Sequence, residues 1–262
     1  MPPLRIGQLA FDADLVAFDK DGTLIDFEFM WGRIARAWVD HLASGPHGES
    51  LRRELYHALG YDADRQRTKP QSPLAVASTG QLQTIAAATL YRCGIPWPEA
   101  EDRAQAAIRS ARARQDLSPA SLVRPAGDVA GLFRRLQDAG VRVGVVTTDE
   151  RAETEETLRV LHVADLVDSM VCGDDGWAIK PAPDMLLALC ERLGVEPSRT
   201  IVVGDTEGDM LMAQRSGAGL RVAVLTGAGD STFLTRLADA VIPSIDDISV
   251  LDDNGPCPVP GL

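Results

Sequence analysis

Cysteine is scarce in this sequence, and the few cysteines present follow no pattern. They are Cys93, Cys172, Cys190 and Cys257. No two of them form a Cys-x-x-Cys pair, and none has a histidine at the spacing of a metal-ligand pair. The spacing therefore gives no sign of a zinc site. This cysteine usage fits the reducing cytoplasm, so we expect a cytoplasmic protein.

Long hydrophobic runs and an excess of basic residues are also missing. Asp12, Asp14 and Asp19 interrupt the apolar residues of the N-terminal segment, which leaves neither a signal-peptide core nor a membrane-spanning helix there. Lys and Arg number 26 against 38 Asp and Glu, so the formal net charge is −12. Because nucleic acids and anionic membranes bind basic surfaces, we expect no nucleic acid and no membrane as a partner.

What the sequence does contain is an alternation of short apolar runs with helical patterns. The runs are too apolar for strands with one face in water, so each predicts a buried strand. Between them lie amphipathic patterns, such as the one in residues 129–136 that is followed by a helix-ending Gly140. This alternation predicts an α/β fold with a doubly wound, Rossmann-like and mostly parallel sheet, which binds ligands beyond the carboxyl ends of its strands. The predicted strands are residues 15–18, 141–146, 167–171, 200–203, 222–225 and 240–242.

One long segment, residues 27–118, breaks this alternation. Trp31 and Trp38 lie on one apolar helical stripe, and further helical patterns follow. The polar and proline-rich residues 60–73 predict a loop between two helical hairpins. We therefore predict an α/β core domain of residues 1–26 and 119–262, with an inserted all-helical domain of residues 27–118.

Two aspartates follow the first predicted strand directly, in the segment Asp19-Lys20-Asp21-Gly22-Thr23-Leu24. Carboxylates spaced two residues apart on one turn repel each other, and a divalent cation is the obvious group to offset that repulsion. Gly22 permits a sharp turn, which lets backbone N–H groups point at a phosphoryl oxygen. An isolated Asp-x-Asp-Gly is more often an ordinary turn, so its place at the carboxyl end of a strand is what favours a catalytic site.

A second acidic cluster follows the predicted strand at residues 200–203, in the segment Gly204-Asp205-Thr206-Glu207-Gly208-Asp209. Hard carboxylate oxygens suit Mg²⁺, which usually keeps several waters. We predict that Asp205 is a direct ligand. Asp209 would reach the ion through water or orient Asp205.

With two further segments, these clusters resemble the ordered motifs of the haloacid dehalogenase-like phosphohydrolase superfamily. The first motif corresponds to residues 19–23, the second to the strand that ends at Thr147, the third to Lys180-Pro181 and the fourth to residues 204–209. Within the superfamily, the Asp-Gly-Thr-Leu form of the first motif and the early helical insertion are most similar to phosphoglycolate phosphatases. The family pattern makes the insertion a cap that closes over the site.

The resemblance implies a reaction through a covalent aspartyl phosphate. Asp19 would attack phosphorus, while Asp21 would protonate the leaving oxygen and then activate water. Thr147 would hydrogen-bond a phosphoryl oxygen, and Lys180 would offset negative charge. The Mg²⁺ residues would be Asp19, Asp21 through its backbone carbonyl, Asp205 and Asp209. The expected substrate contacts are Gly22, Thr23, Thr147, Thr148 and Lys180 from the core and Arg33 from the insertion.

Basic residues of the insertion are candidates for reading the rest of the substrate. Arg33 and Arg36 lie on one face of its first helix, and Arg67 and Lys69 lie in its polar loop. Each could bind a carboxylate or a second phosphate, or could simply be solvated as most helix arginines are.

Several functions stay open. Asp21 disfavours dehalogenation, in which a halide leaves without protonation, and it disfavours phosphonate cleavage. A sugar phosphomutase would use the same nucleophile and acid but return the phosphoryl group to another hydroxyl. A non-catalytic module that binds phosphorylated compounds is the rival from another class. We predict a Mg²⁺-dependent hydrolase of small phosphomonoesters, with a small phosphorylated metabolite as its partner and a monomeric or homodimeric state.

Overall fold

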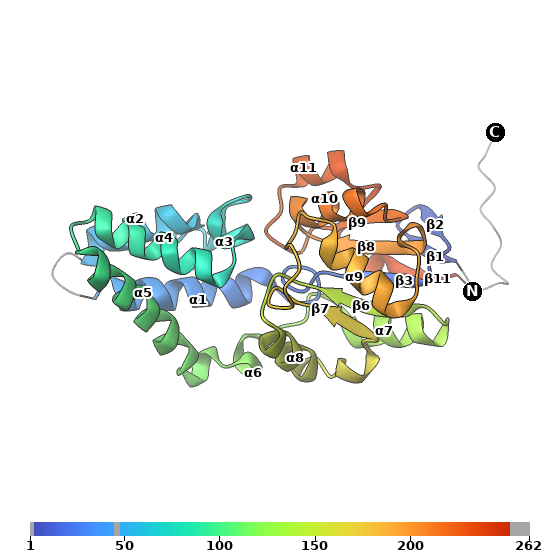
Figure 1. Cartoon of the computed structure of the whole chain (residues 1–262), viewed down its shortest axis with the longest axis horizontal. Coiled ribbons are helices and arrows are strands. Elements are labelled where there is room, and N and C mark those ends of the chain that lie inside the picture. The colour runs from blue at the N-terminus through green and yellow to red at the C-terminus, as the bar shows by residue number, and fades with distance from the viewer. Residues whose placement is uncertain (1–2, 45–47, 252–262) are drawn as a thin grey trace.

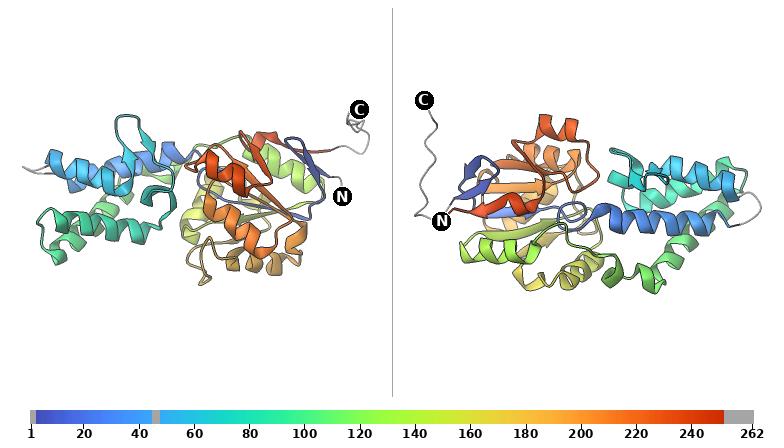
Figure 2. Two further views of the ribbon diagram at one scale, coloured as in Figure 1. Left: turned by 90° about the horizontal axis from the view of Figure 1, so that it is seen from above. Right: turned by 180° about the vertical axis from the view of Figure 1, so that it is seen from behind.

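The chain folds into two lobes, which the computed structural model describes for residues 3–44 and 48–251. One lobe contains the main sheet with its flanking helices, and the other contains helices and a small hairpin (Figure 1). Views from three directions show the lobes side by side along the long axis of the molecule (Figure 2). Within the described residues, no helix has the length and apolar character needed to cross a membrane.

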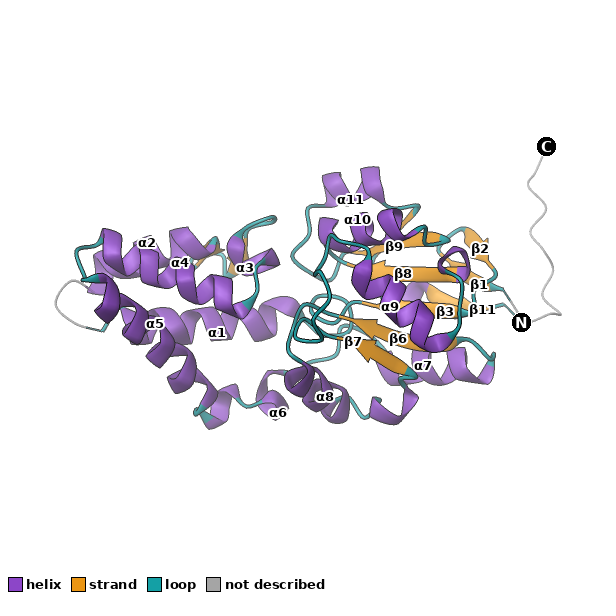
Figure 3. Ribbon diagram, in the orientation of Figure 1, coloured by secondary structure: helices purple, strands orange, loops and turns teal. Residues whose placement is uncertain are grey.

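A six-stranded parallel sheet forms the centre of the first lobe, in the order β10-β9-β8-β3-β6-β7 (Figure 3). Its neighbouring strands all run parallel, so their carboxyl ends meet at one edge. This confirms the predicted doubly wound α/β fold with an inserted helical region. The strands are β3 (Leu15–Phe18), β6 (Arg142–Val146), β7 (Ser169–Val171), β8 (Thr200–Gly204), β9 (Leu220–Val224) and β10 (Ala240–Ile242).

Helices cover both faces of this sheet, because successive strand residues point to opposite sides. Phe18 of β3 faces one side, where its ring centre lies 5.1 Å from that of Phe133. Its neighbour Ala17 belongs to a separate buried cluster on the other side. The first side is covered by α7 (Val129–Asp138) and α8 (Arg151–Val160), and the second by α9 (Asp184–Leu193), α10 (Glu207–Ser216) and α11 (Ser231–Leu237).

A second, three-stranded antiparallel sheet in the order β11-β1-β2 joins the N-terminal residues to a late segment of the chain. The sequence pattern did not predict it, because β1 and β11 each have a polar residue at their centre and so form no apolar run. Leu4, Ile6 and Ile248 bury its apolar side in the same cluster as Phe133. The strands are β1 (Leu4–Ile6), β2 (Leu9–Phe11) and β11 (Ile248–Val250).

The helical lobe has a hydrophobic core of its own, which includes Trp31 and Trp38 with ring centres 6.3 Å apart. Residues 60–73, where a loop was predicted, instead contain an antiparallel hairpin and the start of a short helix. The elements are α1 (Phe27–Leu42), α2 (Gly48–Leu59), β4 (Tyr61–Asp62), β5 (Arg67–Thr68), α3 (Pro73–Val76), α4 (Thr79–Arg92) and α5 (Trp97–Arg112). Shorter helices elsewhere are η1 (Gln115–Leu117), α6 (Pro119–Leu122), η2 (Ala164–Leu166), η3 (Pro197–Arg199) and η4 (Ile245–Asp247).

The chain crosses between the lobes twice, and the two crossings are hydrogen-bonded to each other. The N–H of Asp26 donates to the carbonyl oxygen of Arg124 at 2.8 Å, and the N–H of Ala126 donates to that of Leu24 at 3.0 Å. The Asp26 side chain caps α1 by accepting from the N–H of Phe29, and it also pairs with the Arg124 guanidinium. That guanidinium lies 4.3 Å from the centre of the Phe29 ring. Backbone hydrogen bonds, an ion pair and a cation–π contact therefore hold the two crossing segments together.

Candidate active site

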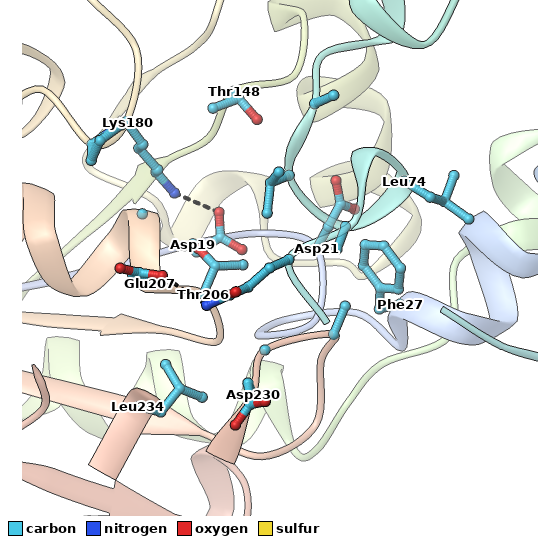
Figure 4. A pocket seen from close by; sticks show the side chains of 18 of the residues that line it. Asp19, Asp21, Phe27, Leu74, Thr148, Lys180, Thr206, Glu207, Asp230 and Leu234 are labelled. Carbon is cyan, nitrogen blue, oxygen red and sulfur yellow. Dashed lines mark hydrogen bonds and ion pairs between the residues drawn. The ribbon is translucent and has the colours of Figure 1, made fainter. Parts of the chain in front are cut away.

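A cavity of about 490 Å³ opens where the carboxyl ends of the parallel strands meet the helical lobe. Five residues predicted to act on the substrate line it: Asp19, Asp21, Thr147, Thr148 and Lys180. Figure 4 shows the ammonium group of Lys180 pointing at the Asp19 carboxylate, with Thr148 nearby and Asp21 on the other side of Asp19. Segments that lie far apart in the sequence thus share one site.

The register of the sheet explains this convergence. Phe18 of β3 is paired with Val145 of β6 and with Val203 of β8. The chain therefore leaves these three strands at nearly the same height, and the residues that follow each strand emerge side by side.

Lys180 joins the candidate nucleophile to the fourth motif. Its Nζ lies 2.6 Å from Asp19 Oδ1 and 2.6 Å from Asp209 Oδ1. The side chains are 6%, 12% and 1% exposed for Lys180, Asp19 and Asp209, so little water screens these contacts. The ammonium therefore balances two carboxylates that would otherwise repel each other.

Asp209 is also held by the start of α10. Thr206 precedes this helix, and its Oγ1 accepts from the N–H of Asp209 while the N–H of Thr206 donates to Asp209 Oδ2 at 3.0 Å. This reciprocal pattern is a capping box, which satisfies N–H groups that a helix start leaves without a partner. Both carboxylate oxygens of Asp209 therefore already have a partner, Oδ1 on Lys180 and Oδ2 on Thr206.

Asp205 carries the clearest sign of a divalent-cation site. Its side chain is buried, and Oδ2 accepts from the N–H of Ala228 at 3.0 Å, whereas Oδ1 has no hydrogen-bond partner among the described residues. Carboxylate oxygens of Asp19, Asp205 and Asp209 all lie within 4.8 Å of one another. A buried carboxylate oxygen without a partner is costly unless a cation is near, and hard oxygen donors suit divalent ions such as Mg²⁺. The residues present therefore fit a divalent cation.

The pKa values of this group point the same way. Burial raises the pKa of Asp19 to about 6, against the opposing charge of Lys180 and with added repulsion from Asp209. Burial, together with the charges of Asp19 and Asp209, also raises the pKa of Asp205 well above its ordinary value. Although burial works against it, pairing with the two carboxylates raises the pKa of Lys180. A bound divalent cation would favour the ionised form of these carboxyl groups.

A second buried ion pair, centred on Lys20, was not predicted from the sequence. Lys20 is fully buried, and its Nζ lies 2.6 Å from Asp21 Oδ1 and 2.8 Å from Asp149 Oδ2. Lysine is usually exposed, so its position between two aspartates gave no reason to expect this burial. The available signal was Asp149, an acid two residues beyond Thr147 in the second motif.

The two carboxyl groups on Lys20 differ in pKa. Burial and the charge of Asp149 raise the pKa of Asp21 to about 8, although Lys20 opposes them. Burial acts to raise the pKa of Asp149 as well, yet the Lys20 ammonium outweighs it and keeps that pKa below the usual value. These opposite shifts favour the ionised form of Asp149 and the protonated form of Asp21. A general acid needs such a protonated group.

Three predicted contact residues do not line the cavity. Gly22 has φ +86°, and a Cβ there would lie 2.5 Å from Asp205 Oδ2. The lack of a side chain at Gly22 therefore leaves space for the Asp205 carboxylate. Thr23 is fully buried. Arg33 donates to the carbonyl oxygens of Ser121 at 3.0 Å and Asp116 at 2.9 Å, which ties α1 to the returning chain. Substrate contact by Arg33 stays a prediction, and in this structure its guanidinium is engaged by these two carbonyl oxygens.

The sequence missed most of the cavity wall that the helical lobe supplies. Phe27 and Trp31 of α1 and Leu74 of α3 line the cavity, and Trp31 belongs to the core of the helical lobe at the same time. Gln71, just before α3, donates from Nε2 to Glu207 Oε2 of the other lobe at 3.0 Å. A helical stripe shows which residues are apolar, but it does not show which end of the helix meets another domain.

Known proteins are similar to this chain over most of its length. The haloacid dehalogenase-like hydrolase family matches residues 13–217. Validoxylamine A 7'-phosphate phosphatase of Streptomyces hygroscopicus subsp. limoneus is 27% identical over 88% of this chain and 93% of its own length. N-acetylmuramic acid 6-phosphate phosphatase of Pseudomonas aeruginosa is 28% identical over 77% of each chain. Phosphoglycolate phosphatase of Neisseria meningitidis is 26% identical over 84% of each chain.

Solved structures show the same fold. A HAD family hydrolase from Deinococcus radiodurans R1 is 23% identical, covers 90% of this chain and 93% of its own, and superimposes with a TM-score of 0.61. The motifs, the relatives and the fold agree on a phosphatase that hydrolyses phosphoric monoesters. The chain belongs to the haloacid dehalogenase-like hydrolases.

Proposed function

We propose that this protein is a Mg²⁺-dependent phosphatase of small phosphomonoesters that forms a transient phosphoryl ester on Asp19. The observation that carries the proposal is the pairing of two buried carboxyl groups in one cavity with two different lysines. Lys180 contacts Asp19 at 2.6 Å, and Lys20 contacts Asp21 at 2.6 Å. Burial and the nearby charge of Asp149 raise the pKa of Asp21 to about 8, above the value of about 6 for Asp19, so the two groups can differ in protonation as a general acid and a nucleophile require.

In the first half of the reaction, a carboxylate oxygen of Asp19 attacks phosphorus and the bond to the ester oxygen breaks. Asp21 donates its proton to that oxygen, and a pKa of about 8 keeps Asp21 protonated beforehand near neutral pH. Thr147 and Lys180 lie on the same cavity wall, where a hydroxyl and an ammonium group stabilise negative charge on the transferring group.

In the second half, Asp21 is ionised and takes a proton from a water molecule that attacks phosphorus. The bond between Asp19 and phosphorus breaks, which releases phosphate and restores the Asp19 carboxylate. Asp21 is protonated again, so one ester and one water have become one alcohol and one phosphate. Each half requires a lower barrier than direct attack of water on the ester.

Mg²⁺ would be held by carboxylate oxygens of Asp19 and Asp205 and by the backbone carbonyl of Asp21, with Asp209 in support. When bound, it would supply positive charge beside the phosphoryl oxygens. The support for this part of the proposal is the unpartnered Oδ1 of Asp205 within the buried cluster.

The division into domains belongs to the same proposal. Residues 1–26 and 119–262 form the core that carries the motifs, and residues 27–118 form a cap. The separate hydrophobic cluster of the helical lobe supports this division, as do the cavity residues that it contributes. A cap over the site excludes water from the nucleophile until the substrate is in place.

The relatives do not settle the substrate. Their names specify validoxylamine A 7'-phosphate, N-acetylmuramic acid 6-phosphate and phosphoglycolate, which share a phosphomonoester and differ in the leaving group. A sugar phosphomutase remains the alternative that uses the same two aspartates. It would transfer the phosphoryl group to a second hydroxyl and would accumulate little free phosphate.

Replacing the nucleophile tests the proposal. Asp19→Asn keeps the size of the side chain but removes the attacking carboxylate. We expect phosphate release from p-nitrophenyl phosphate with Mg²⁺ to fall by a factor on the order of 10³ or more. Asp165→Asn, an exposed charge removal outside the cavity, serves as the control and should keep full activity.

Turnover by Asp19→Asn at the rate of the unmodified enzyme would refute the nucleophile. A chelator should stop the reaction and added Mg²⁺ should restore it, so full activity in chelator would refute the metal role. Formation of a bisphosphate from a sugar phosphate, without accumulation of phosphate, would favour the phosphomutase.

A further inference from the structure

The charge and polarity of the residues that line the cavity outside the four motifs limit which leaving groups it can bind. We propose that the substrate is a phosphorylated polyol or amino-polyol with no negative charge apart from its phosphoryl group, rather than a phosphorylated carboxylic acid. This inference rests on the proposed phosphatase function and concerns the same cavity.

The charges on the wall argue against a second anion on the substrate. Among the described residues that line the cavity, Lys180 is the only basic one. Its ammonium is already within 2.6 Å of two carboxylates, so its charge is balanced. Glu207 and Asp230 add two acidic groups to the wall outside the cation cluster. A carboxylate or second phosphate on the leaving group would meet like charges without a free cation to bind it.

The same two acids suit hydroxyl or ammonium donors. Glu207 Oε2 accepts from Gln71 Nε2 at 3.0 Å, and Asp230 Oδ1 accepts from the N–H of Thr232 at 2.8 Å. These bonds orient both carboxylates, and an ionised carboxylate has about four acceptor positions, so each keeps capacity for a ligand. Figure 4 shows the two carboxylates near the site of Asp19, from different segments of the sheet lobe.

Large apolar side chains also line the cavity, and the space exceeds what a two-carbon acid needs. Phe27, Trp31 and Leu74 contribute from the helical lobe, and Leu211 and Phe233 contribute from the sheet lobe. The volume of about 490 Å³ is within the range of pockets that bind whole metabolite-sized ligands. A carbon ring or chain can place its C–H groups on this apolar surface and its hydroxyl groups on the carboxylates.

Basic residues of the helical lobe do not supply the missing positive charge. Arg33 is bonded to backbone carbonyls, and Arg36 donates to the hydroxyl of Tyr61 at 3.4 Å. Lys69 is exposed and does not line the cavity. Arg67 is likewise exposed, and none of the four basic residues that the sequence suggested for a carboxylate or second phosphate is among the residues that line the cavity.

Matched substrate pairs test the proposal. Sorbitol 6-phosphate and 6-phosphogluconate differ only in a terminal CH₂OH or carboxylate, and 2-hydroxyethyl phosphate differs from phosphoglycolate in the same way. We expect kcat/KM to be higher by about tenfold or more for the uncharged member of each pair. Glucosamine 6-phosphate should be hydrolysed at least as well as glucose 6-phosphate.

A charge-neutral variant identifies the wall residue responsible. Glu207→Gln should raise kcat/KM for 6-phosphogluconate and lower it for glucosamine 6-phosphate, which shrinks the preference. Glu101→Gln removes the same charge from the exposed surface of α5 and should leave the preference unchanged. A variant that is merely less well folded would lower kcat/KM for both substrates. A rise for one substrate and a fall for the other therefore shows that Glu207 selects by charge.

The outcomes distinguish this inference from the function on which it rests. If p-nitrophenyl phosphate is not hydrolysed with Mg²⁺, the phosphatase proposal itself fails. If it is hydrolysed but the carboxylate member of each pair is equal or better, only the leaving-group inference is overturned. Hydrolysis of the aryl phosphate with no turnover of any polyol phosphate also overturns it, as does an unchanged preference in Glu207→Gln.

Discussion

Single residues set the space around the Asp205 carboxylate, and Gly22 is one of them. Its φ of +86° is a backbone conformation that side chains rarely adopt, and the carboxylate of Asp205 occupies the space that a Cβ would need. The sequence accounted for Gly22 by the sharp turn that it permits. The structure adds a second reason, the close packing of Asp205, which lies 183 positions later in the chain. Such a contact cannot be seen in a local pattern.

Gly22→Ala should therefore both destabilise the protein and weaken cation binding. We expect a cost of about 1–3 kcal/mol from the backbone alone, and more from the contact with Asp205. Gly176 is a matched control, because its φ is +88° and a Cβ there would have open space. Urea unfolding of both variants separates the two effects. Equal losses in the two variants would show that Asp205 adjusts without cost.

Lys20 shows the limit of sequence reasoning at the same scale. The motif placed Asp19 and Asp21 in the site, and both line the cavity. Nothing in the motif indicated that Lys20, the residue between them, is buried and forms an ion pair with Asp149. A lysine is read as exposed unless its partners are known, and here the partner comes from another strand end.

Lys20→Met should be strongly destabilising, because it leaves Asp149 and Asp21 buried without their shared cation. Breaking a buried pair in this way costs about 3–5 kcal/mol. Adding Asp149→Asn in a double variant should recover part of the loss, since it removes a stranded charge. Urea denaturation near neutral pH measures both. A loss below about 1 kcal/mol for Lys20→Met would contradict the assigned burial of this pair.

At the scale of elements, the strands of the parallel sheet were predictable, and those of the second sheet and of the small hairpin were not. The runs at 15–18 and 240–242 coincide with β3 and β10, and the other runs differ from their strands by a few residues at the ends. Strands that are buried on both faces must be apolar throughout, so their sequence is distinctive. The three-residue strands of the second sheet and the hairpin of β4 and β5 lack that constraint.

Edge strand β10 is fastened to β9 by an ion pair that gives a pH-dependent prediction. Arg221 donates to Asp239 Oδ2 from Nε at 2.9 Å and to Oδ1 from Nη2 at 2.6 Å. This bonding lowers the pKa of Asp239 below its ordinary value of 3.8. A carboxyl group whose folded pKa is depressed stabilises the protein above its unfolded pKa, and that stability is lost as the pH falls through the folded value.

Asp239→Asn should therefore cost up to about 1 kcal/mol at neutral pH and progressively less below about pH 4. Urea unfolding at several pH values gives the difference between the variant and the unmodified protein. Asp165→Asn, at an exposed position, should show no such trend. A difference that grows on acidification would have the wrong sign for this pair.

For the whole molecule, the sequence indicated two units but not how they meet. Residues 27–118 were identified by their different periodicity, and the helical lobe does have a core of its own. The cavity between the lobes depends on contacts such as that of Gln71 with Glu207, which join residues far apart in the sequence. Long-range contacts of this kind are set by the packed arrangement of whole elements, not by local pattern.

The cation residues all belong to the sheet lobe, so Mg²⁺ should stabilise the two lobes unequally. At a Mg²⁺ concentration of 100 times its Kd, we expect about 2.7 kcal/mol of added protection. Hydrogen exchange should show this in β3 and β8 and little of it in α4 and α5. Asp205→Asn should abolish the gain. Equal protection in both lobes would show that they unfold as one cooperative unit.

The paired crossings between the lobes limit how one lobe can move against the other. A single covalent connection would leave rotation about its own axis free. Residues 24–26 and 124–126 instead run beside each other with cross-links at 2.8 and 3.0 Å, so twisting one strip against the other would break backbone bonds. Bending across the two paired segments keeps those bonds, so they oppose twisting of the lobes more than bending.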